Sequence, residues 1–284
     1  MIKFGPSGRD SSMSLIATID IPKYLKEMNL ELFEYSFGRG INMSNDLAIK
    51  LNQELIKNDI EISIHAPYFI NFATFDEEKA LNNNKFIFDS LGKLKILGCN
   101  RCVFHPGSLT KNTHEKAMDK LLYRINNLIE EKYKLNYEEY YLCAETMGKL
   151  GQLGTTQDII QICNLDKNII PCIDFGHVNA RENGKFYTRH DYIDYFSEFI
   201  DGVGIEKINI AHVHFSKIQY SQSGEVRHLT FDDEIFGPPF EPFIEAVIEL
   251  NLNPHIICES AGTQLKDVLQ MKDYYLESSR NVWS

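Results

Sequence analysis

Short apolar runs alternate with longer amphipathic segments along the whole chain. Runs of about four to eight mostly apolar residues are typical of buried strands, whereas a period near 3.6 residues is typical of helices. The pattern predicts strands at residues 2–5, 30–35, 61–65, 101–105, 139–145, 168–174, 207–214 and 255–259. It predicts helices at residues 19–28, 44–57, 76–97, 113–132, 156–163, 191–200, 240–250 and 264–276.

Strand and helix therefore alternate eight times. This repeat, with right-handed crossovers, is typical of a parallel (β/α)8 barrel, which is commonly one domain of about 250 residues. The chain has 284 residues, and we expect residues 1–284 to form a single TIM-barrel domain of the α/β class. An open, doubly wound sheet is the alternative, but no G-x-G-x-x-G motif follows an early strand.

Imidazole and carboxyl side chains gather at the ends of the predicted strands. Those at or within two positions of a strand end are His65, His105, Glu145, Asp174, His212 and Glu259. His177 follows Asp174 in a D-x-x-H pair, with Gly176 expected to free the backbone for a turn. Barrel active sites lie at the C-terminal strand ends, and these ligand types suit zinc or manganese. We therefore expect a metal site at this mouth.

The composition is that of an ordinary globular protein, with 43% hydrophobic and 24% charged residues. No apolar run reaches the roughly 18 residues of a membrane span, and the N-terminus lacks a signal-peptide pattern, so a cytoplasmic protein is expected. The net charge of −11 argues against a broad electrostatic nucleic-acid interface but allows a small basic rim around a metal centre. The six cysteines, including the pair Cys99 and Cys102, are expected to be structural.

Recurrent polar motifs mark the predicted strand ends. They read H-A-P-Y-F-I-N from His65, F-H-P-G-S from Phe104, A-E-T-M-G from Ala144, I-D-F-G-H from Ile173, H-V-H-F-S-K from His212, R-H from Arg227 and C-E-S from Cys258. In type and order they resemble the endonuclease IV family of apurinic/apyrimidinic endonucleases, within the xylose isomerase-like barrel superfamily. The resemblance covers nearly the whole chain and implies a zinc-dependent phosphodiesterase acting at abasic sites in duplex DNA, in base excision repair.

The resemblance also implies a cluster of two or three zinc ions, for which manganese is an alternative. One ion would be held by His65, His105 and Glu145. A second would share Glu145 as a bridge and add Asp174, His212 and Glu259. Paired metals lower the pKa of a shared water and clamp a phosphodiester, so Glu145 and Glu259 are the expected catalytic residues, with Glu259 orienting the nucleophile.

The third ion implied by the resemblance would use His177 and His228. The family has an Asp two residues before the second of these ligands, where this chain has Val226. The neighbouring Glu225 is the candidate to replace it, given a shifted loop. His214 stands where the family has Asn, and faces the same side of its strand as His212, so it is a further candidate ligand.

DNA contacts are also implied by the resemblance. Tyr68 and Asn71 match family positions after the first His ligand, Arg39 lies near the family's inserting arginine, and Lys217 matches a family lysine able to meet a phosphate. Family loops insert such side chains at the lesion and flip it out of the stack. The expected partner is duplex DNA with abasic sites, bound by a monomer.

Two other functions fit parts of the pattern. A sugar isomerase or epimerase of the same superfamily, with one or two divalent ions, is favoured by the acidic balance. His65 and His105 together favour the multinuclear nuclease instead. A barrel that keeps metal only for stability, or as a nucleic-acid binding module, would not need six converging ligands.

Overall fold

The computed structural model describes residues 2–282 of the chain. Within these residues, eight parallel strands form one sheet in the order β1-β12-β9-β8-β6-β4-β3-β2. Their bounds are β1 Lys3–Pro6, β2 Leu32–Ser36, β3 Glu61–His65, β4 Arg101–Phe104, β6 Tyr141–Glu145, β8 Ile169–Asp174, β9 His212–Phe215 and β12 His255–Cys258. The predicted (β/α)8 barrel is confirmed.

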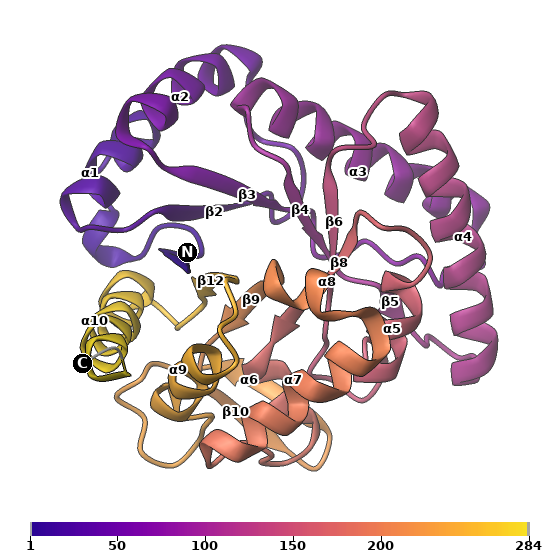
Figure 1. Cartoon of the computed structure of the whole chain (residues 1–284). Helices are drawn as coiled ribbons and strands as arrows, with labels where there is room; N and C mark the ends of the chain where they lie inside the picture. The colour runs from indigo at the N-terminus through magenta and orange to yellow at the C-terminus, as the bar shows by residue number, and fades with distance from the viewer. Residues whose placement is uncertain (1, 283–284) are drawn as a thin grey trace.

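Helices surround this sheet on its outer side (Figure 1). They are α1 Ile21–Glu27, α2 Asn45–Asn58, α3 Glu77–Leu97, α4 His114–Lys134, α5 Thr156–Cys163, α6 Phe175–Arg181, α7 Arg189–Val203, α8 Ile205–Asn209, α9 Phe240–Glu249 and α10 Gln264–Val282. Short 3-10 turns at Ser11–Met13 and Thr18–Asp20 precede α1. None of the helices in the described part is long and apolar enough to cross a membrane.

Capping residues explain why four of the predicted helix starts, those of α2, α3, α4 and α5, were accurate. Ser44, Asp76, Thr113 and Thr155 each accept a hydrogen bond from a backbone N–H of the first turn of α2, α3, α4 and α5, respectively. A helix start leaves its first N–H groups without backbone acceptors, and these side chains supply them.

The barrel closes along a seam between β1 and β2. Glu31 N–H donates to Phe4 O at 3.1 Å, and Gly8 N–H donates to Glu34 O at 2.9 Å. At Gly5, a Cβ atom would lie 1.9 Å from Leu32 O. The absence of a side chain at Gly5 is therefore what lets the first two strands approach each other.

Two predicted features of the backbone were wrong. The seventh strand was expected to begin at Lys207, but that residue lies in α8, and β9 begins at His212. Gly176 was expected to free a turn, but Asp174 accepts a hydrogen bond from His177 N–H and α6 starts directly after it. Gly176 lies inside this helix, where a Cβ atom would be 2.6 Å from Ser216 O. The glycine is needed for close packing rather than for a turn.

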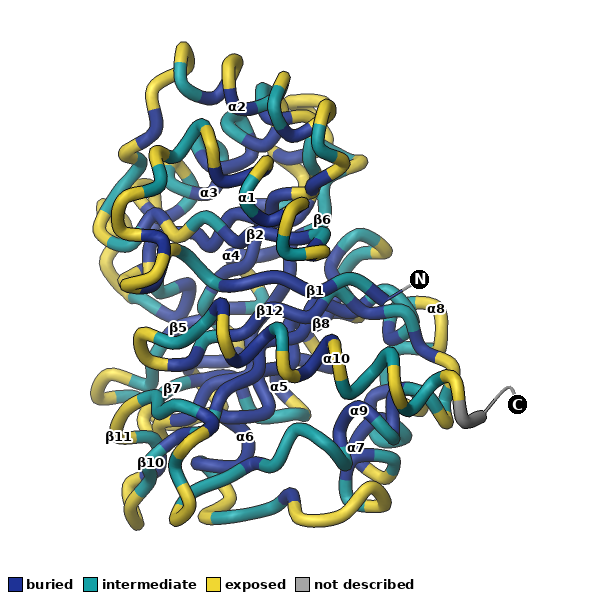
Figure 2. Tube along the Cα trace, turned by 90° about the vertical axis from the view of Figure 1, so that its left-hand side faces the viewer, coloured by how far each residue is buried: buried dark blue, intermediate teal, exposed yellow. Residues whose placement is uncertain are grey.

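Two small antiparallel sheets, not predicted from the sequence, extend the loops beyond the barrel. One pairs β5 (Gly107–Ser108) with β7 (Gln152–Leu153), and the other is the hairpin of β10 (Ile218–Ser221) and β11 (Gly224–His228). All four strands lie at the left side of Figure 2, and α8 and both chain ends lie at the opposite side. They follow the C-terminal ends of barrel strands, so they build the mouth.

Aromatic side chains fill the space between the barrel and the helices on one side. Phe243 on α9 is fully buried, with its ring centroid 4.8 Å from that of Phe175 and 5.0 Å from that of Phe215. The buried chain runs through the centre of the molecule and the exposed positions lie on the outer turns of the helices (Figure 2). This packing holds β8, α6 and β9 in place, and these elements carry several site residues.

Candidate metal centre

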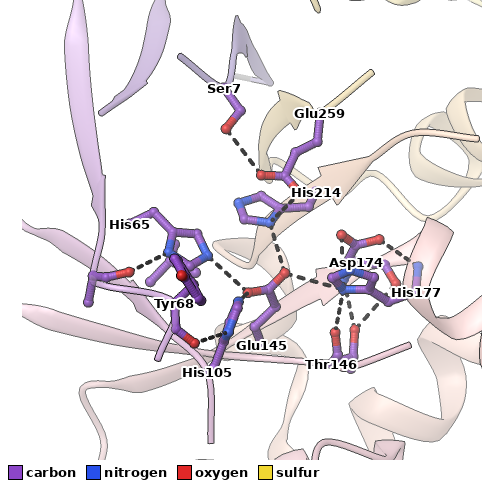
Figure 3. A network of polar contacts seen from close by, with 12 residues as sticks. Ser7, His65, Tyr68, His105, Glu145, Thr146, Asp174, His177, His214 and Glu259 are labelled. Carbon is purple, nitrogen blue, oxygen red and sulfur yellow. Dashed lines mark hydrogen bonds and ion pairs between the residues drawn. The ribbon is translucent and has the colours of Figure 1, made fainter. Parts of the chain in front are cut away.

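Glu145, the last residue of β6, stands at the centre of the barrel mouth with 1% of its surface exposed. His65 Nε2 and His105 Nε2 lie 3.1 Å and 3.0 Å from its Oε2 atom. His214 Nδ1 and His177 Nδ1 lie 3.2 Å and 3.3 Å from its Oε1 atom. Four rings from different parts of the chain thus converge on one carboxylate (Figure 3).

Four groups of side chains in the described part have the composition and spacing of metal sites, with ligand atoms within 4.8 Å of one another. One of them, Cys172, His212 and His214, is fully buried inside the barrel, and the other three lie at the mouth. They are His65, His105 and Glu145; Glu145, Asp174, His214 and Glu259; and His177, Glu225 and His228. Glu145 belongs to the first two groups. His177 links the third group to it, because its Nδ1 atom faces Glu145 and its Nε2 atom lies 3.6 Å from Glu225 Oε2.

His212 is not among the ligands of these three mouth groups and belongs to the fourth group, with Cys172 and His214. It is fully buried deeper in the barrel, where its Nε2 atom lies 2.9 Å from Glu34 Oε2. His214 belongs to the second mouth group, and its Nδ1 atom lies 3.5 Å from Glu259 Oε2. Both rings point into the barrel because strand residues two apart share a face. His214 is two residues nearer the C-terminal end of β9 than His212.

The hairpin of β10 and β11 supplies Glu225, the carboxylate of the third group. The pairing of β10 with β11 shifts register between Gln219 and Tyr220, the irregularity of a β-bulge. Glu225 lies next to His177, while the Val226 side chain is 51% exposed. The register shift therefore accompanies a hairpin in which Glu225, and not Val226, faces His177.

Gly148 gives Glu225 the room to reach His177. A Cβ atom at Gly148 would lie 2.7 Å from the Cβ atom of Glu225 and 3.1 Å from Cδ2 of His177. The backbone of the hairpin is fixed to the same loop, since Glu225 N–H donates to Gly148 O at 3.2 Å. Two mouth loops thus meet at this residue.

The charges of the centre are strongly interdependent. Burial lowers the pKa of His65, but its hydrogen bond to Glu145 and the charge of that carboxylate outweigh burial and raise the pKa to about 9. Burial likewise opposes protonation of His177, yet the charges of Asp174 and Glu145 raise its pKa to about 10. Burial raises the pKa of Glu145, but His105 and its neighbouring rings bring it well below the usual value. In the metal-free protein His65 and His177 thus retain protons where cations would bind.

The donor set fits divalent metal ions. Nitrogen and carboxylate oxygen are ligands that zinc and manganese accept, and a shared carboxylate suits two cations a few ångström apart. Asp174 Oδ2 is fully buried and accepts no hydrogen bond from the described residues, although His177 Nδ1 lies 3.2 Å away. A buried carboxylate oxygen without a donor is costly unless a cation approaches it. These residues therefore favour a metal centre.

Two supporting residues were missed in the sequence. Ser7, after β1, donates a hydrogen bond from its Oγ to Glu259 Oε1 at 3.1 Å, which orients that carboxylate (Figure 3). Glu34 lies fully buried in β2 beside His212 and His214. A charged residue in the middle of a predicted buried strand was the available signal for Glu34.

The four residues expected to contact DNA have different surroundings. Tyr68 lines the mouth and is 52% exposed, and its carbonyl oxygen lies 3.1 Å from His105 Nδ1. Asn71 Oδ1 accepts hydrogen bonds from Ala73 and Ser108 N–H, so this side chain braces the loop after β4. Lys217 Nζ donates to Phe231 O and Asp233 O at 3.0 and 2.6 Å. Arg39 is exposed.

A cavity of about 330 Å³ opens above the three groups. Lys149 lines this cavity and brings a positively charged ammonium group to it. Its side chain is 55% exposed. Its Nζ atom lies 3.9 Å from Glu225 Oε1. The surrounding loop is held by Arg181, whose Nη1 donates to Met147 O, Lys149 O and Gln152 O at 3.2, 2.7 and 3.3 Å. Lys149 is thus presented to the mouth from a fixed backbone.

The fold is that of a known family. Residues 22–280 match the model of the xylose isomerase-like TIM barrel family, and the chain belongs to that family. It is 31% identical over 275 residues to an uncharacterised protein of Methanocaldococcus jannaschii, covering 96% of this chain and 97% of that protein. It is 33% identical over 174 residues to a probable endonuclease 4 of Methanosphaera stadtmanae, and this match spans 58% of the chain and 59% of that protein.

Solved structures of two kinds share the fold. A D-tagatose 3-epimerase-like protein matches with a TM-score of 0.75 and 21% identity, covering 100% of both chains. Endonuclease IV from Thermus thermophilus matches with a TM-score of 0.70 and 17% identity, covering 97% of this chain and 99% of that one. The expected kinship with endonuclease IV is confirmed, in a divergent branch of the superfamily. The fold alone does not separate the nuclease from the epimerase.

Proposed function

We propose that the protein is a metal-dependent phosphodiesterase of the endonuclease IV type that incises duplex DNA at abasic sites. The observation that carries the proposal is the third group, His177, Glu225 and His228, beside the two groups that share Glu145. A site for one cation is complete with four ligands, so a single-ion sugar enzyme would leave both outer groups without use.

Cations bound at the three groups would supply an activated water and neutralise the charge of a phosphodiester. Zinc is the proposed metal, with two or three ions per chain. Glu145 would be the shared ligand. Glu259, oriented by Ser7, would hold the attacking water in line with the phosphorus through its carboxylate.

Substrate contacts would come from the rim. Tyr68 offers an exposed ring beside the mouth, able to stack on a base or fill the gap left by a missing one. Lys149 would face a phosphate group with its ammonium. Asn71 and Lys217 would support the loops from within, because their polar atoms already have partners in the protein.

The deciding experiment uses a duplex with one tetrahydrofuran abasic analogue and the zinc-loaded protein. We expect a single incision on the 5′ side of the analogue, absent from an otherwise identical intact duplex. A Glu145→Gln variant serves as the inactive control for contaminating nucleases. Equal cleavage by this variant, or none by the wild type, would contradict the proposal.

A sugar epimerase is the second candidate, because Glu145, Asp174, His214 and Glu259 alone can hold one ion. The epimerase-like structure with the TM-score of 0.75 has the same fold. Metal content separates the two functions: two or three zinc ions per chain favour the nuclease, and one manganese ion with turnover of a ketose favours the epimerase.

A further inference from the structure

Glu34 is a carboxylate enclosed in the barrel beneath the metal centre. It has no exposed surface. Its Oε2 atom accepts a hydrogen bond from Ser63 Oγ at 2.9 Å and lies 2.9 Å from His212 Nε2. Its Oε1 atom lies 2.9 Å from His214 Nε2. One buried acid therefore contacts both histidines of β9.

His214 is the ring that joins this buried acid to the mouth. Its Nδ1 atom faces Glu145 and Glu259, at 3.2 and 3.5 Å. Its Nε2 atom faces Glu34 Oε1 at the distance of an ion pair. A cation among the mouth ligands would approach Nδ1, and the ring proton would then be on Nε2, towards Glu34.

The surroundings argue against Glu34 as a mere filler of the barrel. Removing a carboxylate from water costs several kcal/mol in proteins, and an apolar residue of similar size would fill the space without that cost. Val103 and Cys143, which are fully buried in an apolar cluster inside the barrel, show that apolar side chains pack well there. The carboxylate is retained where it touches a candidate ligand.

We propose that Glu34 is a positioning residue for the metal centre: it holds His214 with Nδ1 directed at the cation and the proton on Nε2. A carboxylate behind a ligating imidazole fixes its orientation and raises its basicity. His212 would hold the other oxygen of Glu34 without contacting metal. The inference rests on the metal centre of the proposed function but not on the identity of the substrate.

The test compares Glu34→Gln with Asp267→Asn, the same change at another fully buried carboxylate. Asp267 accepts hydrogen bonds from Phe231 N–H and Thr263 Oγ rather than contacting a candidate ligand. We expect Glu34→Gln to weaken the affinity for one zinc ion by about 10–100-fold in chelator competition. The visible spectrum of the cobalt-loaded variant should shift. Asp267→Asn should lower the melting temperature while keeping metal affinity and spectrum.

A second measurement needs no variant and covers the case in which Glu34→Gln does not fold. Long-range ¹H–¹⁵N correlation spectra of the zinc-loaded wild type, labelled at histidine, report which nitrogen of His214 carries the proton. We expect the proton on Nε2 and zinc on Nδ1. The reverse arrangement, or unchanged affinity and spectrum in Glu34→Gln, overturns the inference. Failure to incise DNA with these metal results intact overturns only the nuclease assignment, whereas failure to bind metal overturns both.

Discussion

His177 Nε2 lies 3.6 Å from Glu225 Oε2, although one residue belongs to α6 and the other to the β10–β11 hairpin. This contact completes the third group, which in the proposed function holds a further cation. We predict that Glu225→Ala lowers the zinc content by one ion per chain. Incision of the abasic duplex should fall by at least about tenfold, as expected for the loss of a group that tunes a metal.

Val226→Ala is the matched control for this variant, because its side chain is half exposed on the same strand. It should retain wild-type zinc content and activity. If elemental analysis found equal zinc in Glu225→Ala and the wild type, the third site would not exist as described.

The raised pKa values of His65 and His177 predict opposite pH effects in the metal-free and metal-loaded protein. An unfolded His has a pKa of about 6.5, whereas the folded values are about 9 and about 10. The native metal-free state therefore binds more protons within this window, and its free energy of unfolding should fall as the pH rises from about 6.5 to about 10.

Zinc must displace the same protons, so its affinity should rise over this window. Denaturant melts of the metal-free protein and chelator competition across the window measure the two effects. The lowered pKa of Glu145 acts in a more acidic range and does not change this sign. A free energy of unfolding that increased with pH without metal would contradict the proton assignment.

Lys149→Ala is expected to weaken binding of the abasic duplex without removing metal. A lysine that meets one phosphate adds about 0.9 to the slope of log affinity against log salt concentration. Fluorescence anisotropy at several salt concentrations should show a slope reduced by this amount, and Lys149→Arg should restore it. Lys50→Ala, an exposed lysine on the outer helix α2, is the control and should leave the slope unchanged.

The aromatic cluster behind β8 and β9 should dominate stability on that side of the barrel. Phe243→Ala removes a fully buried ring from between Phe175 and Phe215 and is expected to cost about 3–5 kcal/mol of unfolding free energy. Phe75→Ala, at a 53% exposed ring, should cost far less. Urea denaturation of the two variants gives the comparison, and similar costs would show that the cluster is not a centre of stability.

Local chemistry made much of the fold predictable from the sequence. Side-chain caps such as Ser44 and Thr113 mark helix starts, and the buried strands read as apolar runs. The polar residues at strand ends indicated the mouth, because parallel strands deliver their C-terminal ends to one side. Helix α6 was missed because its Phe-Gly-His start resembles a turn, whereas the tight contact of Gly176 with Ser216 O is a tertiary feature.

The ligands of the centre were less predictable, because they depend on how deep a residue lies in the barrel and on the register of the β10–β11 hairpin. His212 and His214 share one face of β9, and the choice between them depends on where the strand ends, which a pattern locates only to a few residues. The position of Glu225 depends on a β-bulge in the β10–β11 hairpin, and neither the hairpin nor the bulge was predicted from the sequence. Glu34 was overlooked because its partners lie on strands far along the chain.

The contacts between β1 and β2 close the barrel, and they also position residues of the metal centre. Ser7, directly after β1, forms a backbone bridge with Glu34 of the neighbouring β2 and donates a hydrogen bond from its side chain to Glu259. A substitution that separates these two strands, such as one at Gly5, would thus first disturb the position of Glu259 at the mouth. Its earliest sign would be faster zinc loss at temperatures where the circular dichroism of the helices is still that of the intact protein.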